Sequence, residues 1–231
     1  MSQDTTLSLF VKGNADIVDA TLSKSDGGAK LDKGVRELIS ERFPAVSLEV
    51  SSEPAGDFAA LRRELEMGRS TMIDTRPDIV VLSIAEEVRG LPRRGANAEE
   101  AVRAVKDDLA AAIELIKERV GAHVLVANAS TIDPTVKVRN YHGLPEEPIP
   151  LRVHRLDLML VGVSHERGIS IIDVDRVLAE LGTDGNMDGP LSYGPRACHV
   201  IARETARILE EYGFFDDRPV LAQVGAKGQT A

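Results

Sequence analysis

Tryptophan is absent from this sequence, and its aromatic side chains are limited to five phenylalanines and three tyrosines. So few rings leave little material for the platforms on which bases or sugars stack. Basic residues are also in the minority, since 28 lysines and arginines face 37 aspartates and glutamates and give a formal charge of −9. That charge disfavours nonspecific attraction to phosphate backbones and to anionic lipid. We therefore expect neither a nucleic-acid partner nor a membrane partner.

Cysteine is nearly absent as well. Cys198 is the one cysteine, so no intrachain disulfide can form, and a lone thiol is typical of a reducing compartment. No apolar run approaches the roughly 20 residues that span a bilayer, and the first residues lack the basic stretch of an export signal. The sequence predicts a cytoplasmic protein.

Motifs for metals and cofactors are missing too. The sequence contains no His-x-x-x-His, no Cys-x-x-Cys and no acidic loop with calcium-binding spacing. The Gly-Asn-Ala at residues 13–15 is not a dinucleotide fingerprint, and no P-loop occurs. We expect no bound metal and no required cofactor.

What is present is the composition of an ordinary globular protein, with 43% hydrophobic and 28% charged residues. A chain of 231 residues fits one large α/β domain that can fold without disulfides or a structural metal. We expect this domain to cover residues 1–215. Periodicity is weak in residues 216–231, which we expect to form a tail.

Five short apolar segments alternate with helical patterns along the chain. The run at 79–84 is typical of a strand buried on both faces of a parallel sheet, and the apolar stripe of 99–120 predicts an amphipathic helix. The predicted strands are 6–11, 46–50, 79–84, 123–127 and 169–172, and the predicted helices are 31–43, 57–67, 99–120, 151–166, 174–181 and a terminal helix containing residues 197–212. This order predicts a doubly wound, five-stranded parallel sheet in a three-layer α/β/α domain.

Ligands bind at the carboxyl ends of the strands in such sheets. The segments that should lie at this end are 12–19, 51–56, 85–97, 128–150 and 182–195.

Several of these segments resemble the sequence blocks of the SGNH (GDSL-type) hydrolases. The first strand runs into Gly13 where that superfamily has Gly-Asp-Ser after an apolar strand. The matching segments, within about residues 6–213, are 10–15, 49–56, 76–82, 171–174 and 188–189 with the terminal helix. The resemblance implies a flavodoxin-like sheet, and the superfamily contains esterases, lipases, acetylxylan esterases and acyltransferases.

The residues that carry the chemistry of that superfamily are replaced here. Residues 14–15 are Asn-Ala where the resemblance implies Asp-Ser, and alanine has no atom that can attack a carbonyl. Residues 85–87 are Ala-Glu-Glu where an asparagine would donate to the oxyanion. Asp188 matches the carboxylate of the last block, but 190–192 are Pro-Leu-Ser where its histidine should follow three residues later. The resemblance therefore implies the fold of the superfamily but not the acyl-enzyme intermediate that its serine forms.

Three titratable residues are candidates for remaining proton-transfer chemistry, namely Asp16, Asp188 and His199. Asp16 opens a helical turn, where capping free N–H groups is the ordinary role and proton transfer beside the missing serine is the functional one. His199 is the histidine nearest to the last block. Its place in the terminal helix also suits a half-buried structural histidine.

Basic residues follow two neighbouring strands at the ligand end. Arg89 is the first of them after the third strand, and Lys137 is the first after the fourth. Two basic groups at one end of the sheet predict a small anionic ligand, with solvated loops as the alternative and Glu86 as a carboxylate that could neutralise them. The ligand-binding residues that we expect are Gly13, Asn14, Gly56, Glu87, Arg93, Arg94, Arg139 and His142.

The sequence leaves three functions open. The favoured one is a protein of this fold that lacks hydrolase chemistry and binds a small molecule or a protein partner, including a second copy of itself. The second is an enzyme, such as an acyltransferase, lyase or hydrolase, that uses other residues in the same pocket. The third is an ordinary esterase with Ser23, Ser25 or Ser192 as nucleophile, although these serines lack the required strand-turn-helix setting.

Overall fold

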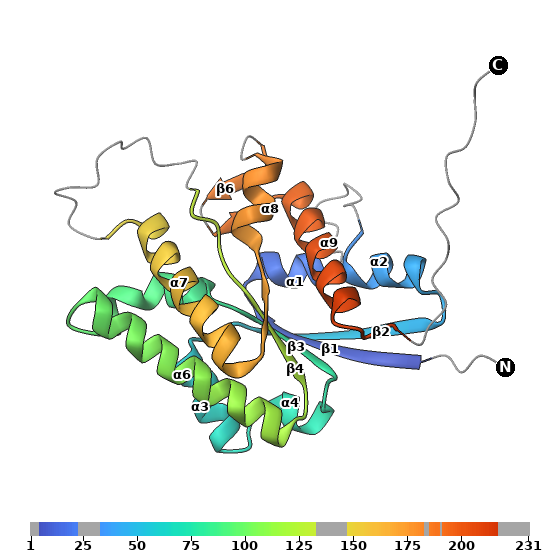
Figure 1. Cartoon of the computed structure of the whole chain (residues 1–231), viewed down its shortest axis with the longest axis horizontal. Coiled ribbons are helices and arrows are strands. Elements are labelled where there is room, and N and C mark those ends of the chain that lie inside the picture. The colour runs from blue at the N-terminus through green and yellow to red at the C-terminus, as the bar shows by residue number, and fades with distance from the viewer. Residues whose placement is uncertain (1–4, 23–32, 133–146, 183–184, 190, 217–231) are drawn as a thin grey trace.

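The computed structural model describes residues 5–22, 33–132, 147–182, 185–189 and 191–216. Its centre is a five-stranded sheet of order β2-β1-β3-β4-β5 in which all neighbouring strands are parallel (Figure 1). The strands are β1 (Thr5–Gly13), β2 (Val46–Pro54), β3 (Ile79–Ser83), β4 (His123–Ala127) and β5 (Ser170–Ile172). The doubly wound parallel sheet and its five strands are confirmed.

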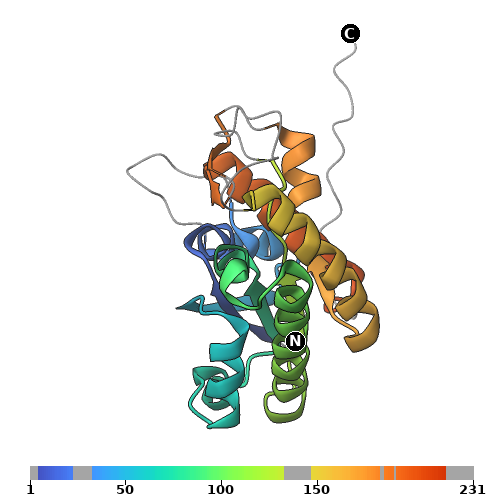
Figure 2. The ribbon, with the colours of Figure 1, turned by 90° about the vertical axis from the view of Figure 1, so that its left-hand side faces the viewer.

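Helices cover both faces of the sheet (Figures 1 and 2). One face carries α1 (Ala15–Leu22), α2 (Val35–Arg42), α8 (Val174–Leu181) and α9 (Pro195–Glu211). The other carries α3 (Phe58–Glu66), α4 (Thr71–Thr75), α5 (Ala85–Gly90), the short 3-10 helix η1 (Leu91–Arg93), α6 (Ala98–Arg119) and α7 (Ile149–Arg167). Within the described residues, no helix is long and apolar enough to cross a membrane.

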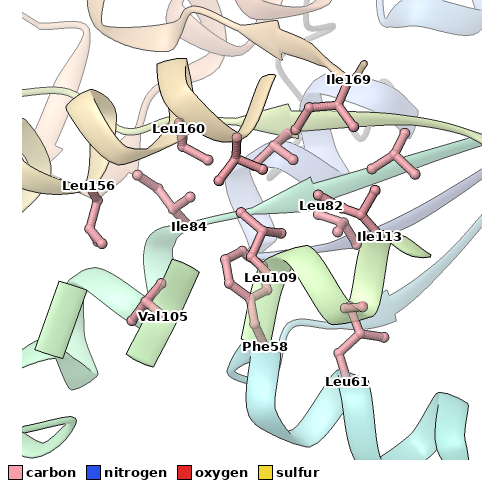
Figure 3. Packing of buried hydrophobic residues seen from close by; sticks show 14 of the residues in the cluster. Phe58, Leu61, Leu82, Ile84, Val105, Leu109, Ile113, Leu156, Leu160 and Ile169 are labelled. Carbon is pink, nitrogen blue, oxygen red and sulfur yellow. The ribbon is translucent and has the colours of Figure 1, made fainter. Parts of the chain in front are cut away.

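Alternate side chains of the central strands enter two separate cores, because successive residues of a strand point to opposite faces. In β3, Val80 and Leu82 pack with α3, α6 and α7, whereas Ile79 and Val81 pack with the helices of the other face. Figure 3 shows the first of these cores, in which Leu82 of β3 lies beside Ile113 of α6. Burial on both faces explains why these strands are nearly continuous apolar runs.

Several short elements were not among those predicted. They include the helices α1 and α4. Residues 85–97 and 182–195, for which the sequence predicts neither helix nor strand, contain α5, η1 and a small antiparallel hairpin of β6 (Met187–Gly189) and β7 (Ser192–Tyr193). These elements are too short to show a clear period in the sequence. Most of the expected tail, residues 217–231, lies outside the described residues.

Candidate functional site

A cleft of about 610 Å³ lies at the carboxyl ends of β1 and β2. The strand order reverses at β1, because the chain passes from β2 on one side to β3 on the other, and such a switch point is where doubly wound sheets bind ligands. The cleft is lined by Gly13, Asn14, Asp16, Val18, Asp19, Ser52, Glu53, Pro54, Ala55, Glu86, Arg89, Leu191 and Ser192. Of the expected site residues, it brings together Gly13, Asn14 and Asp16.

A chain of hydrogen bonds ties the ends of β1 and β3 together beneath this cleft. The Ser83 hydroxyl donates to Asn14 Oδ1 at 2.9 Å and accepts from the Ala85 N–H at 3.2 Å. Asn14 Nδ2 then donates to Asp16 Oδ2 at 3.1 Å. Ser83 and Asn14 are buried. The Asn14 amide therefore joins the two strand ends and also orients the Asp16 carboxylate.

Asp16 is the best placed of the three candidate acid-base groups. Burial raises the pKa of its carboxyl group, while hydrogen bonds from the Tyr193 backbone and the Asn14 amide act in the opposite direction. The Cys198 thiol donates to the Asp16 carbonyl at 3.6 Å, and burial raises the pKa of this thiol to about 12. Cys198 is thus held as a neutral thiol behind the cleft and is a poor nucleophile.

The charged side chains of the cleft are mainly acidic. Asp16, Asp19, Glu53 and Glu86 line it, and Arg89, its basic lining residue, forms an ion pair with Glu86. The buried Lys12 ammonium at the end of β1 lies 3.3 Å from Glu53 Oε2 but also 2.5 Å from Glu64 Oε2. The described lining residues therefore carry more negative than positive charge.

The arginines that were expected to attract an anion lie elsewhere. Arg94 is half-buried and lies near three carboxylates, with an ion pair to Asp108 and longer contacts to Glu87 (3.6 Å) and Asp57 (3.8 Å). Arg93 is exposed on η1, and neither arginine lines the cleft. The other two basic candidates, Arg139 and His142, lie outside the described residues. The described arginines therefore give no support to an anionic pocket.

Glu87 does not line the cleft, and its carboxylate instead supports the start of α3. It is 1% exposed and accepts a hydrogen bond from the Phe58 N–H at 2.5 Å. Burial raises the pKa of its carboxyl group, and the Phe58 N–H and the Arg94 guanidinium lower it again. Glu87 thus satisfies a free N–H at the start of α3. Gly56 precedes α3, directly after the lining residue Ala55.

The remaining acid-base candidates are not brought to the cleft by described contacts. His199 lies on α9 with its Nδ1 atom 2.9 Å from the Lys33 carbonyl oxygen, and it is not a lining residue. For Asp188 only the backbone is described, as the middle residue of β6, so its catalytic role stays a prediction. No group of three or more His, Cys, Asp or Glu residues in the described ranges could hold a metal ion.

Comparison with known proteins decides the fold. No protein-family model and no curated protein matches the sequence. Among solved structures, Axe2, an acetylxylan esterase from Geobacillus stearothermophilus, aligns with a TM-score of 0.62 and 14% identity over 93% of this chain and 97% of that chain. A lipolytic protein of the G-D-S-L family from Veillonella parvula aligns with a TM-score of 0.59 and 15% identity, covering 89% of this chain and 99% of its own. The chain has the SGNH hydrolase fold.

The SGNH fold gives the replaced sequence blocks a place in space. Ala15 is the first residue of α1, directly after β1, and Ala85 is the first residue of α5, directly after β3. Leu191 follows Asp188 by three residues, lines the cleft and is 6% exposed. An apolar side chain thus lies at the cleft wall where the resemblance implies a histidine.

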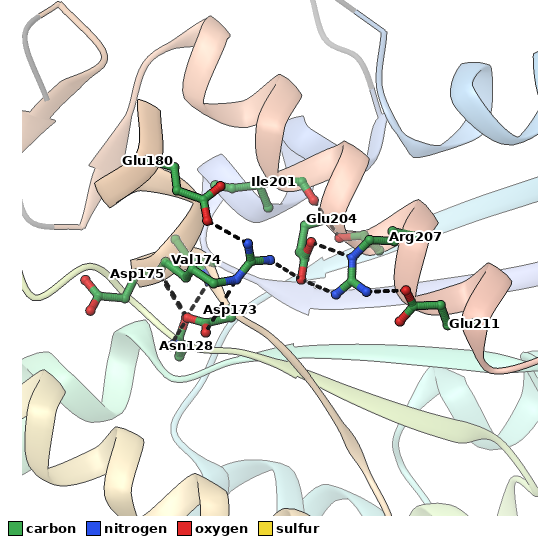
Figure 4. A network of polar contacts seen from close by, with 11 residues as sticks. Asn128, Asp173, Val174, Asp175, Glu180, Ile201, Glu204, Arg207 and Glu211 are labelled. Atoms are coloured by element: carbon green, nitrogen blue, oxygen red, sulfur yellow. Dashed lines mark hydrogen bonds and ion pairs between the residues drawn. The ribbon is translucent and has the colours of Figure 1, made fainter. Parts of the chain in front are cut away.

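A second polar cluster, at the end of β4 and the start of α8, was missed in the sequence. Asn128 at the end of β4 contacts Asp173 and the first backbone N–H groups of α8 (Figure 4). Burial, followed by the charges of Asp175 and Asp173, raises the pKa of Asp157 on α7 to about 7. The Asp-Val-Asp directly after β5 is a helix-start signal, and it could have predicted Asp173 as the N-cap of a helix. No sequence signal marks Asp157, because a single aspartate in a long amphipathic helix cannot be distinguished in the sequence from a residue on the solvated face.

Proposed function

We propose that this SGNH-fold protein does not hydrolyse esters and acts by binding a small molecule in the cleft at the ends of β1 and β2. The observation that carries the proposal is the Leu191 side chain, which lines the same cleft as Asn14 and Asp16. A leucine can neither accept a proton from a nucleophile nor return one to a leaving group. Ala15 and Ala85 support the same conclusion, since neither can supply a nucleophile or a side-chain donor for an oxyanion.

Serine hydrolysis by another residue has little support. Ser52 and Ser192 line the cleft, but none of the described lining residues is a histidine. Ser23 and Ser25 lie outside the described residues.

A second candidate function is an enzyme in which Asp16 transfers protons. It is favoured by one observation, the raised pKa of a carboxyl group that lines the cleft. Such an enzyme would need a substrate activated without a serine nucleophile. The variant Asp16→Asn separates the two candidates, because it would abolish turnover in the enzyme and only alter ligand affinity in the binding protein.

We expect that the purified protein does not accelerate the hydrolysis of p-nitrophenyl acetate above its spontaneous rate. We also expect no labelling by a fluorophosphonate. Position 15 lacks a nucleophilic atom, and no histidine lines the cleft beside its serines in the part of the chain that the structure describes. Mass spectrometry of the treated protein, beside an active serine hydrolase labelled in parallel, is the measurement. Stoichiometric modification of any serine would overturn the proposal.

The charge of the cleft predicts that its ligand is neutral or cationic rather than anionic. In a thermal-shift series, the affinity of the protein should fall in the order benzylamine, benzyl alcohol, benzoate. The amine should bind at least about tenfold more tightly than the carboxylate, a difference of about 1.4 kcal/mol in binding free energy. Added salt should reduce the difference, because exposed charges are screened. Glu86→Gln, which removes the partner of Arg89, should also reduce it, whereas Arg93→Ala should not. Preference for benzoate would restore the anionic interpretation.

A further inference from the structure

The long helix α7 exposes large apolar side chains, whereas α6 beside it does not (Figure 2). Leu158 is 64% exposed and Val161 is 51% exposed. All exposed residues of α6 are charged, but the exposed residues of α7 are Leu151, His154, Leu158, Val161, His165 and Glu166. A helix with one face in a core normally presents polar residues to water on the other face. The outer face of α7 is therefore unlike that of an ordinary surface helix.

These exposed residues form a single seam along α7. At alternating steps of three and four residues, its members are Leu151, His154, Leu158, Val161 and His165. This spacing places the side chains on one line, and it is the pattern by which two helices pack side by side in a coiled coil. The seam is about 21 Å long, since a helix rises about 1.5 Å per residue. The opposite face of α7 is already occupied, because Leu156 and Leu160 are fully buried in the core.

Ion pairs formed within the chain border the α7 seam. They are Lys106–Glu166, Arg167–Glu114 and Arg155–Glu147. Each pair carries no net charge, although the chain as a whole has a formal charge of −9. A strongly acidic or basic partner would find no complementary charge in these pairs. Two copies of an acidic chain repel each other over most of their surface, and they can meet with least repulsion where charges are balanced.

We propose that the α7 seam is a dimer interface, in which α7 packs antiparallel against the α7 of a second copy of this chain about a twofold axis. In a twofold interface, residue i contacts residue j of the partner and j contacts i. The spacing puts the axis between Leu158 and Val161, so that Leu158 contacts Val161 of the partner subunit. The antiparallel arrangement also sets the positive end of each helix dipole beside the negative end of the other.

The length of the seam sets the strength of this dimer. Two helices in contact over about 21 Å bury less surface than the roughly 1,200–2,000 Å² of a standard stable interface. We therefore expect a reversible dimer with a Kd of about 10–100 μM. No residue of the seam lines the cleft, so the dimer does not depend on what the cleft binds.

The first test is sedimentation equilibrium of the wild type, Leu158→Glu and the control Met67→Glu. Leu158→Glu puts an unpaired charge at the centre of the interface and should weaken the dimer at least about a hundredfold. Met67 is 55% exposed at the end of α3, so Met67→Glu makes the same kind of change away from the seam and should dimerise like the wild type. A wild type that stays monomeric at about ten times the expected Kd would overturn the proposal. So would a Leu158→Glu dimer as tight as that of the control.

A second experiment tests the antiparallel geometry. Leu158→Glu and Val161→Lys should each be monomeric alone, and circular dichroism establishes that both are folded. An equimolar mixture should dimerise again, because position 158 of one copy faces position 161 of the other and the new carboxylate meets the new ammonium. In a parallel pair each position would face itself, and mixing would restore nothing. A mixture that stays monomeric would therefore overturn the proposed pairing.

Discussion

Replacing Arg94 by alanine is expected to lower the stability of the protein by about 3 kcal/mol, or the melting temperature by about 6–12 °C. The guanidinium lies among Asp108, Glu87 and Asp57, and its side chain is 15% exposed. Removing it leaves the Glu87 carboxylate buried without this cation and leaves Asp108 with Arg62, 2.6 Å away, as its remaining partner. Uncompensated buried charge is the costly outcome, more than the loss of the ion pair itself.

The adjacent Arg93 provides the control for this prediction. Arg93 is exposed on η1, so Arg93→Ala should change stability by less than about 0.5 kcal/mol. Adding Glu87→Gln to Arg94→Ala should recover part of the loss, since it removes one of the stranded charges while keeping an acceptor for the Phe58 N–H. The measurement is the melting temperature of the wild type, Arg93→Ala, Arg94→Ala and the double variant Arg94→Ala, Glu87→Gln. An Arg94→Ala protein as stable as Arg93→Ala would show that the three acids do not rely on this arginine.

The central strands of the sheet could be predicted because they are buried on both faces. Val80, Val81 and Leu82 contribute to two different cores, so the strand reads as an uninterrupted apolar run, and α6 shows a clear stripe over 22 residues. The elements α5, β6 and β7 are too short for a hydrophobic period to be recognised in the sequence.

The carboxyl end of β1 could be predicted as a ligand end, but the charge of the cleft could not. Sequence position placed Arg94 close to the end of β3, and only the fold shows that η1 turns this arginine back toward α6 and α3. The charge that a cleft presents depends on which side chains are already paired. Pairing between residues far apart in the chain, such as Lys12 with Glu64, leaves no signal in one sequence.

The same reasoning explains why the polar cluster at Asn128 was missed. Asn128 follows β4, and Asp173 and Asp175 stand at the start of α8, so each has an ordinary local role at a strand end or a helix start. Their hydrogen bonds to one another arise only where the two elements meet.

Restoring a hydroxyl at position 15 alone is expected to leave the protein inactive. Ala15→Ser would supply a nucleophile without a base or an oxyanion donor, and the members of such a site act as a unit. The single variant should therefore hydrolyse p-nitrophenyl acetate no faster than the wild type and take up no fluorophosphonate. A robust esterase from this one change would mean that a base and an oxyanion donor already exist in the cleft.

The triple variant Ala15→Ser, Ala85→Asn, Leu191→His should be at least about a hundredfold faster than Ala15→Ser, because a positioned base contributes about 10² to 10⁴ and an oxyanion donor about 10² to 10³. The matched control carries Leu191→Gln in place of Leu191→His, which is polar and similar in size but cannot act as a base. Circular dichroism and melting curves establish that each variant is folded before its kinetics are compared. Activity and labelling at position 15 in the triple variant, and their absence in the control, would place positions 15, 85 and 191 around one reacting centre. A folded but inert triple variant would mean that these positions do not converge there, and that the cleft differs from an SGNH active site in geometry as well as in residues.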